Sequence, residues 1–439
     1  MALAGLLVAC TGAAACAHYQ GRPLPPAPDL ALTPALTAPA RAFWIPGMRP
    51  HPFPAHGLDE TALLTLAVSD NPDLKAARLQ AGVAGAELFA AGLLPDPQIS
   101  AGLARSALHG GYSLGVAQEL QALWLRGPAV AGARAGQQQV RLNILWQEWQ
   151  VAGRASQLFA QTQSDAQLRP VLAAERTLWS RHYRADQTAM RAGDLTVATT
   201  AADLAQLSAT EANLNQLDTD IALTHDKLTA LLGLRPGAKL DLVGPSQTAA
   251  VTAEEFRSAV TALPRRRPDL RALAAGYRLQ EAAVREAVLA QFPAVSFGLT
   301  RGRDPAEGLV SSGLDLVLTL PVFNRNRGAI AVQRATRAQL RQAYLARLDQ
   351  AVSDASQARA TLALLLRRQA ALRTQLPVLE HIAHAARASL AAKQLDQASY
   401  VQFQSQRLAA QAAVIGGNAA IAQARTALRV VLALPLGSP

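Results

Sequence analysis

Two stretches of the chain, residues 58–234 and 255–434, read as two copies of one unit, and this duplication limits the fold more than any single motif. Asn71–Leu74 (Asn-Pro-Asp-Leu) recurs 196 positions later as Arg267–Leu270 (Arg-Pro-Asp-Leu). Other matching residues stand 200 positions apart, namely Arg134 with Arg334 and Leu195 with Leu395. Each copy has the order helix, hairpin of two strands, very long helix, so one structural unit is expected to occur twice.

The duplication divides the chain into six parts. The N-terminal segment before the first copy is rich in proline and is expected to be extended, without helix or sheet of its own. The expected boundaries are 1–15 for a signal peptide, 16–57 for this proline-rich segment, 58–234 for the first repeat, 235–254 for a linker, 255–434 for the second repeat and 435–439 for a tail.

Both cysteines, Cys10 and Cys16, lie at the start of the chain, so a thiol site or a disulfide framework in the rest is excluded. Residues 2–15 are apolar and rich in small side chains, as in a secretory signal, although they carry no Lys or Arg. Either cysteine ends a string that resembles a bacterial lipobox. We favour Cys16 as the lipidated residue, because the proline-rich segment then follows directly. Cys10 is the alternative, and an ordinary cleaved signal with incidental cysteines is a third interpretation.

Composition limits the classes of protein that remain. Half of the residues are hydrophobic, mostly Ala and Leu, and only 5% are aromatic, which suits long, closely packed helices. No uninterrupted apolar run after the leader reaches the length of a transmembrane helix. The net charge is +11, but the arginines are scattered at helical spacing rather than gathered in stripes with aromatics, so nucleic acid is not an expected partner.

Four segments of about ten residues alternate between apolar and small or polar side chains, which is the pattern of tilted membrane-spanning strands. Two soluble hairpins would also alternate, but little of the chain remains to cover them. Four strands cannot close alone, and an open edge cannot face lipid, so closure by three chains with twelve strands is expected. The side chains expected to face lipid are Ile99, Leu103, Tyr112, Leu114, Val116, Val295, Phe297, Leu299, Leu314, Leu316 and Leu318.

Two very long helices are expected, from Gly127 to about Ala192 and from Gly328 to about Ala392. Pro170 and Pro377 lie inside them and should kink or locally break the helices. Each helix then turns sharply, and the residues expected to cap the returning helices are Thr196 and Asp396.

Several strings resemble the TolC family of outer-membrane efflux proteins: Asn71–Leu74, Leu93–Pro97, Arg267–Leu270, Gln291–Ser296 and Leu320–Gly328. The resemblance covers essentially the whole mature chain. It implies a mainly α fold with a small β part, in which long antiparallel coiled-coil helices build an α-barrel. Two β-hairpins would form one third of a twelve-stranded transmembrane β-barrel in a homotrimer. The implied partners are outer-membrane lipid, a periplasmic adaptor and an inner-membrane pump of the RND type. The string Gly92–Pro97 is similar to the branch that exports metal cations.

No catalytic, cofactor or metal site is expected. His381 and His384, next to Glu380, are interpreted as a solvated helix face. The turns of the long helices are the better candidates, since converging helices would form the narrowest point of a duct. The aperture candidates are Arg191, Asp194, Lys393, Gln394, Asp396 and Gln402. Family members often carry acidic residues just past the second turn, where this chain has Ser399 and Gln402. Asp194 and Asp396 are equally interpreted as turn and cap residues.

Three functions remain open from the sequence. The first is a passive outer-membrane duct that exports metal cations or drugs, with a proton-driven pump supplying the energy. The second is the duct of a type I system that secretes proteins, which would use the same fold. The third belongs to another class, a periplasmic coiled-coil adaptor or scaffold, and predicts no lipid-facing strands.

Overall fold

The computed structural model describes residues 20–28, 30–33, 57–105, 110–246 and 248–436. The same order of elements occurs twice along the chain: two helices, a strand hairpin and two further helices. The first set is α2 (Glu60–Asp70), α3 (Pro72–Ala91), β1 (Gln98–Arg105), β2 (Gly110–Glu119), α4 (Gln121–Ala192) and α5 (Val197–Leu231). The second set is α6 (Ala253–Arg266), α7 (Pro268–Leu289), β3 (Ala294–Arg303), β4 (Val310–Thr319), α8 (Arg327–Ala391) and α9 (Gln397–Val431).

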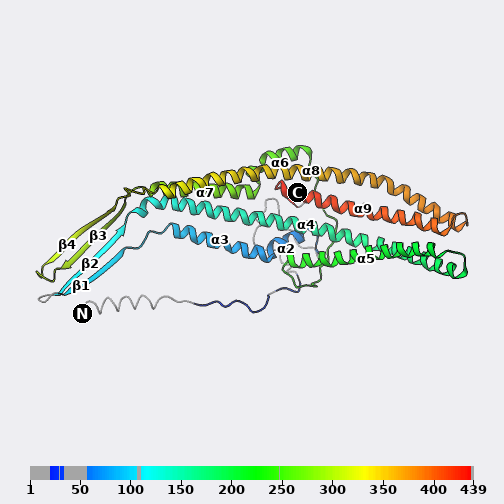
Figure 1. Cartoon of the computed structure of the whole chain (residues 1–439), viewed down its shortest axis with the longest axis horizontal. Coiled ribbons are helices and arrows are strands. Elements are labelled where there is room, and N and C mark those ends of the chain that lie inside the picture. Colours follow the sequence, from blue (N-terminus) through cyan, green and yellow to red (C-terminus); the bar gives the residue numbers. More distant parts are fainter. Residues whose placement is uncertain (1–19, 29, 34–56, 106–109, 247, 437–439) are drawn as a thin grey trace.

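The molecule is elongated, with the four strands at one end and the turns between the long helices at the other (Figure 1). This architecture is mainly helical with one small antiparallel sheet, as the sequence predicts. Within the described residues, no helix combines the length and the apolar character that a membrane crossing requires.

The repeated Pro-Asp-Leu motif separates the first two helices of each set. The residue before proline is pushed out of the helical region of backbone space, and both Asn71 (ψ 124°) and Arg267 (ψ 119°) have left it. The break expected near Asn71 is therefore confirmed, and Pro72 and Pro268 open the next helix, where a missing N–H costs nothing.

The motif also makes the same long-range contact in both sets. Asn71 Nδ2 donates to the carbonyl of Leu231 (3.0 Å), and Arg267 Nη1 donates to the carbonyl of Val431 (3.3 Å). Leu231 and Val431 are the last residues of α5 and α9. In each set, the start of the helix that leads to the strands is thus tied to the end of the returning helix.

The two long helices, α4 and α8, contain 72 and 65 residues, so each extends for roughly 100 Å. α4 begins at Gln121, earlier than the expected start at Gly127. Both helices continue through Pro170 and Pro377, where a kink or a local break in hydrogen bonding is expected, so neither proline ends its helix. Each proline removes one backbone donor, and both prolines lie at exposed positions of their helices. Beside Pro170, Arg169 Nε donates to Asp218 of α5 at 2.7 Å.

The helices form a single wall. Next to the sheet, neighbours pack in the order α3, α4, α7, α8, and beyond the middle the order becomes α5, α4, α9, α8 (Figure 1). Two hydrophobic clusters hold the middle together. One joins α2 and α4 to the end of α5. The other joins four helices, α6, α7, α8 and α9. The wall therefore has two edges, α3 with α5 on one side and α8 on the other.

Candidate functional site

The four strands form one sheet in the order β1-β2-β3-β4, so the two hairpins lie side by side and β2 pairs with β3. Directly paired residues of an antiparallel sheet point to the same face. Ile99, Val116, Leu299 and Leu314 form one such row across all four strands. We call the face that carries this row the apolar face. It holds every side chain expected from the sequence to face lipid, and among the described residues Ile99 (73% exposed) and Leu314 (71%) are largely uncovered.

The opposite face of the sheet carries small and polar side chains. One row across it reads Ser100, Gly115, Thr300 and Gly313. A Cβ added to Gly115 would lie 2.6 Å from Ser100 Oγ and 3.3 Å from Thr300 Cγ2. Glycine therefore stands here because the neighbouring side chains already fill the space, and the face can line water without large apolar groups.

The apolar face ends in arginines, which the sequence analysis did not anticipate. In the rows nearest the hairpin loops, Arg301 pairs with Leu114, and Arg303 pairs with Tyr112. Arg105 ends β1 on the same face. The signal was present in the sequence, because these arginines continue the period-two alternation of Val295, Phe297 and Leu299 and of Ile99 and Leu103. The face thus changes from apolar to basic along its length.

Neither outer strand is paired on its free side within the described part of the chain. β1 pairs only with β2, and β4 pairs only with β3. Because β1 follows the edge helix α3 and β4 leads into the edge helix α8, the free edges of the sheet continue as the free edges of the helical wall.

The six aperture candidates lie at the two turns, at the end of the molecule farthest from the sheet (Figure 1). All six side chains are exposed in the protomer. The expected caps are confirmed: Thr196 Oγ1 accepts from the N–H of Thr199 at 3.2 Å, and Asp396 Oδ1 accepts from the N–H of Ser399 at 2.8 Å. The backbone hydrogen bond from Ser399 holds the pKa of Asp396 below its usual range.

A buried polar cluster near the first turn was missed by the sequence analysis. We call His182 and Asp186 of α4 together with Asp203 of α5 the His–Asp–Asp cluster. Its possible ligand atoms all lie within 4.8 Å of one another. His182 Nε2 lies 3.5 Å from Asp186 Oδ2 and 3.7 Å from Asp203 Oδ1. The spacing of His182 and Asp186, four residues apart on one helix face, was the available signal.

The electrostatics of the cluster reflect two carboxyl groups held together away from water. The pKa of Asp203 is raised to about 6, first by burial and then by its hydrogen bond to Asp186. His182 opposes this shift. The Trp179 ring lies 5.9 Å from the His182 ring and, with Leu207, packs against Val401 of α9. The cluster therefore adjoins the contact between the two helical hairpins.

The histidine pair considered from the sequence is placed differently. His381, His384 and Glu380 are all exposed on α8. Among the described residues, the His–Asp–Asp cluster is the group whose geometry could hold a metal ion.

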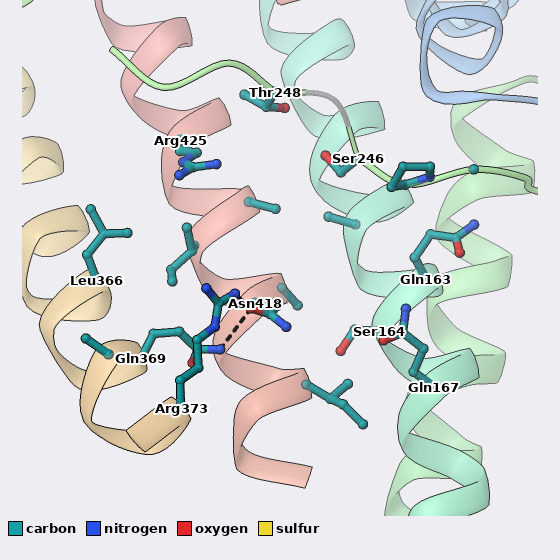
Figure 2. A pocket seen from close by; sticks show the side chains of 18 residues that line it. Gln163, Ser164, Gln167, Ser246, Thr248, Leu366, Gln369, Arg373, Asn418 and Arg425 are labelled. Atoms are coloured by element: carbon teal, nitrogen blue, oxygen red, sulfur yellow. Dashed lines mark hydrogen bonds between the residues drawn. The ribbon is translucent and has the colours of Figure 1, made fainter. Parts of the chain in front are cut away.

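A cavity of about 640 Å³ lies in the middle of the wall, between α4, α8, α9 and the segment around Ser246 (Figure 2). Gln369 Nε2 donates to Asn418 Oδ1 at 2.8 Å, and Arg373 Nη2 donates to the same oxygen at 2.8 Å. The lining is amide, hydroxyl, guanidinium and apolar, with no Asp, Glu, His or Cys among its described residues. It offers hydrogen bonds but no acid–base pair.

Cys10 and Cys16, the alternative lipidation sites, lie outside the described residues.

No protein-family model matches the chain, and no curated protein sequence matches it. Its fold is nevertheless close to that of several solved structures. CusC, from a study of its transmembrane channel formation, shares 16% identity with a TM-score of 0.69, over 95% of this chain and 99% of that chain. The outer membrane channel CmeC of Campylobacter jejuni shares 14% identity with a TM-score of 0.70, over 92% and 94%. The outer membrane protein VceC of Vibrio cholerae shares 16% identity with a TM-score of 0.70, over 86% and 97%. The chain therefore has the fold of these outer-membrane channel proteins.

Proposed function

We propose that this chain is one third of a homotrimeric outer-membrane channel of the TolC family, and that it serves as a passive exit duct. The observation that carries the proposal is the wall with two free edges. In the part of the chain that the structure describes, β1 and β4 each present an unpaired row of backbone groups beside an exposed apolar face. An open edge cannot face lipid, because its N–H and C=O groups would find no partner there. Pairing β4 of one copy with β1 of the next removes both edges and gives a twelve-stranded barrel.

The helical edges support the same closure. The α8 edge leaves large apolar side chains uncovered, among them Leu364 (60% exposed) and Val332 (60%). The opposite edge does the same, with Leu79 of α3 (76%) and Val197 of α5 (74%). Exposed apolar side chains thus occur on both edges of the wall, where a neighbouring copy would contact them. Edge-to-edge packing of three copies covers it and extends the barrel into a helical tunnel.

The order of side chains along the sheet supports its orientation in a membrane. The apolar rows would contact the hydrocarbon, while Tyr112 and the arginines near the hairpin loops would lie among the headgroups, where aromatic and basic side chains favour the interface. The small and polar face would line the water-filled lumen.

In this role the chain would carry out no chemistry of its own. A periplasmic adaptor and an inner-membrane proton-driven pump of the RND type would select metal cations or drugs and supply the energy. The exposed aperture candidates at the turns would narrow the far end of the tunnel. Cys16, or alternatively Cys10, would carry the lipid anchor. Acyl labelling of a Cys16→Ala variant tests this assignment. Loss of the label would support Cys16, and a retained label would assign the anchor to Cys10.

The membrane assignment is tested with two neighbouring residues of β4. Leu316 lies on the apolar face and Val317 on the small and polar face, yet their exposed fractions in the protomer are similar, 62% and 59%. Leu316→Arg should impair outer-membrane assembly by about 2–4 kcal/mol near mid-bilayer, while Val317→Arg should be mild. Membrane fractionation and the yield of detergent-resistant trimer provide the measurement.

Equal effects of the two substitutions would contradict the assigned faces. Recovery of the unsubstituted protein in the soluble periplasmic fraction would instead favour the adaptor or scaffold.

A further inference from the structure

The His–Asp–Asp cluster is buried, polar and incompletely paired. The side chain of His182 is 4% exposed, and that of Asp186 is 12% exposed. Within the described structure, His182 Nδ1 and Asp203 Oδ2 have no hydrogen-bond partner. Buried polar atoms without partners are rare in folded proteins and call for a specific explanation.

Asp203 and Asp186 interact with each other, but the distances from His182 to both do not fit ordinary hydrogen bonds. A good N–H···O bond joins atoms about 2.7–3.2 Å apart, and a protonated Nε2 can direct its single hydrogen to only one acceptor. Here Nε2 lies between two carboxylate oxygens, at 3.5 and 3.7 Å, and is close enough to neither.

The same distances do fit three ligands that share one ion. Ligand atoms arranged tetrahedrally at about 2.0–2.2 Å from a zinc ion stand roughly 3.5 Å from one another. One imidazole nitrogen and two carboxylate oxygens form a donor set that first-row divalent cations accept. The two carboxylates would neutralise the ion, and the side chain of Asp203, 15% exposed, leaves a path from solvent.

We propose that His182, Asp186 and Asp203 bind a divalent transition-metal cation of the Zn²⁺ class, which ties α4 to α5. The ligands lie within about three helical turns of the turn at Gly193. Because α5 supplies one ligand and α4 supplies two, the ion closes a link across this hairpin. The second hairpin has no such link, since the positions 200 residues later carry Ile382, Ala386 and Phe403.

The test uses the purified full-length chain, with Zn²⁺ alone as the probe. Metal analysis after dialysis should find one Zn²⁺ per chain, and titration calorimetry should give a single class of site. Asp203→Asn, which preserves size, should weaken Zn²⁺ binding at least tenfold, and His182→Gln should do the same. The matched control is the double variant His381→Gln/His384→Gln, which removes the exposed histidines and should bind like the unsubstituted protein.

Unchanged binding by Asp203→Asn, or lost binding by the His381/His384 variant, would overturn the proposal. So would displacement of the ion by excess Mg²⁺, because an oxygen-preferring acidic patch would then explain it. If the variants fail to fold, X-ray absorption of the unsubstituted protein with Zn²⁺ decides: one imidazole with oxygen ligands supports the site, and two or more imidazoles contradict it. Zn²⁺ should also slow hydrogen exchange in the α4–α5 hairpin and not in the α8–α9 hairpin. These readouts need no transport, so they stand apart from the proposed duct function.

Discussion

The two helical hairpins at the far end of the molecule, α4–α5 and α8–α9, have turns of the same geometry but different side chains behind those turns. In both, the turn residue has a left-handed backbone, Gly193 with φ 87° and Lys393 with φ 58°. The next residue in each turn donates its N–H back into the helix, Asp194 to Ala189 and Gln394 to Ser389. Behind this common turn, the α4–α5 hairpin buries the His–Asp–Asp cluster, whereas the α8–α9 hairpin has apolar side chains at those positions.

The difference shows that the turn and the interior of a hairpin can diverge separately. A turn needs only local hydrogen bonds and a tolerated backbone angle. The interior must either pack apolar groups or satisfy polar ones. At the matching positions of the second hairpin, Ala386 is 5% exposed and needs no partner, while Ile382 is 36% exposed. In the first hairpin two carboxyl groups lie beside one imidazole, and the proposed ion would neutralise the carboxylates.

The largest expected effect comes from the residue that joins the two hairpins. Trp179 is 7% exposed and packs against Leu207 and Val401. Trp179→Ala should lower the free energy of opening at this end by about 3–5 kcal/mol, because it leaves a cavity. Its counterpart Leu379 is only half-buried, so Leu379→Ala should cost clearly less. Native-state hydrogen exchange measures both, and equal losses would mean that Trp179 does not join the hairpins.

A second substitution introduces a single carboxylate into the α8–α9 hairpin and so tests the difference between the two hairpins directly. Ala386→Asp places a carboxylate where Asp186 stands in the first copy, but without a histidine or a second ligand. Burying this unpaired charge should lower the free energy of unfolding by on the order of 3 kcal/mol. Denaturant titration provides the measurement. If Ala386→Asp lowers the free energy of unfolding less than the reverse change Asp186→Ala does, the second hairpin already contains a group that can pair with a buried carboxylate.

A smaller effect is expected from exchanging the turn residues. Gly193→Lys should destabilise the first turn by about 1 kcal/mol, because a side chain disfavours the left-handed backbone. Apart from its two chain neighbours, no residue has an atom within 4 Å of the position where its Cβ would stand, so the expected cost comes from the backbone conformation. Lys393→Gly should stabilise the second turn by up to about 1 kcal/mol. Backbone hydrogen-exchange rates at each turn provide the measurement. If both substitutions change the stability of their turns in the same direction, the two turns do not have the same geometry.

The smallest expected effect is a difference in how the stability of the two helix caps, Thr196 and Asp396, depends on pH. The pKa of Asp396 is lowered, above all by the backbone hydrogen bond from Ser399, so the carboxylate stabilises the folded cap. This stabilisation is present above the unfolded pKa and is lost as pH falls through the lower folded pKa. The neutral cap Thr196 has no such dependence. Acidification should therefore increase backbone hydrogen exchange at the second turn relative to the first, measured from pH 7 downward. Asp396→Asn should abolish this pH-dependent difference between the two turns.

Several features of the fold could be predicted from local patterns. Alternation across Val295–Leu299 and Leu314–Leu318 correctly indicated strands with two different faces, and Asn71 before Pro72 correctly indicated a helix break. At Pro170 the sequence indicates a kink or a local loss of hydrogen bonding, and α4 nevertheless continues past it. The His–Asp–Asp cluster was missed because His182 and Asp186 become a possible site only beside Asp203, which lies on another helix.

The sequence by itself determined the duplication, the kinds of elements and their order, because periodicity and proline act within a few residues. Only the tertiary structure decided how the copies meet. It pairs β2 with β3, separated by some 180 residues, leaves β1 and β4 each with one free side among the described residues, and brings Asp203 of α5 against His182 of α4. Such contacts depend on which faces pack together over long distances in the chain, and no local pattern records that choice.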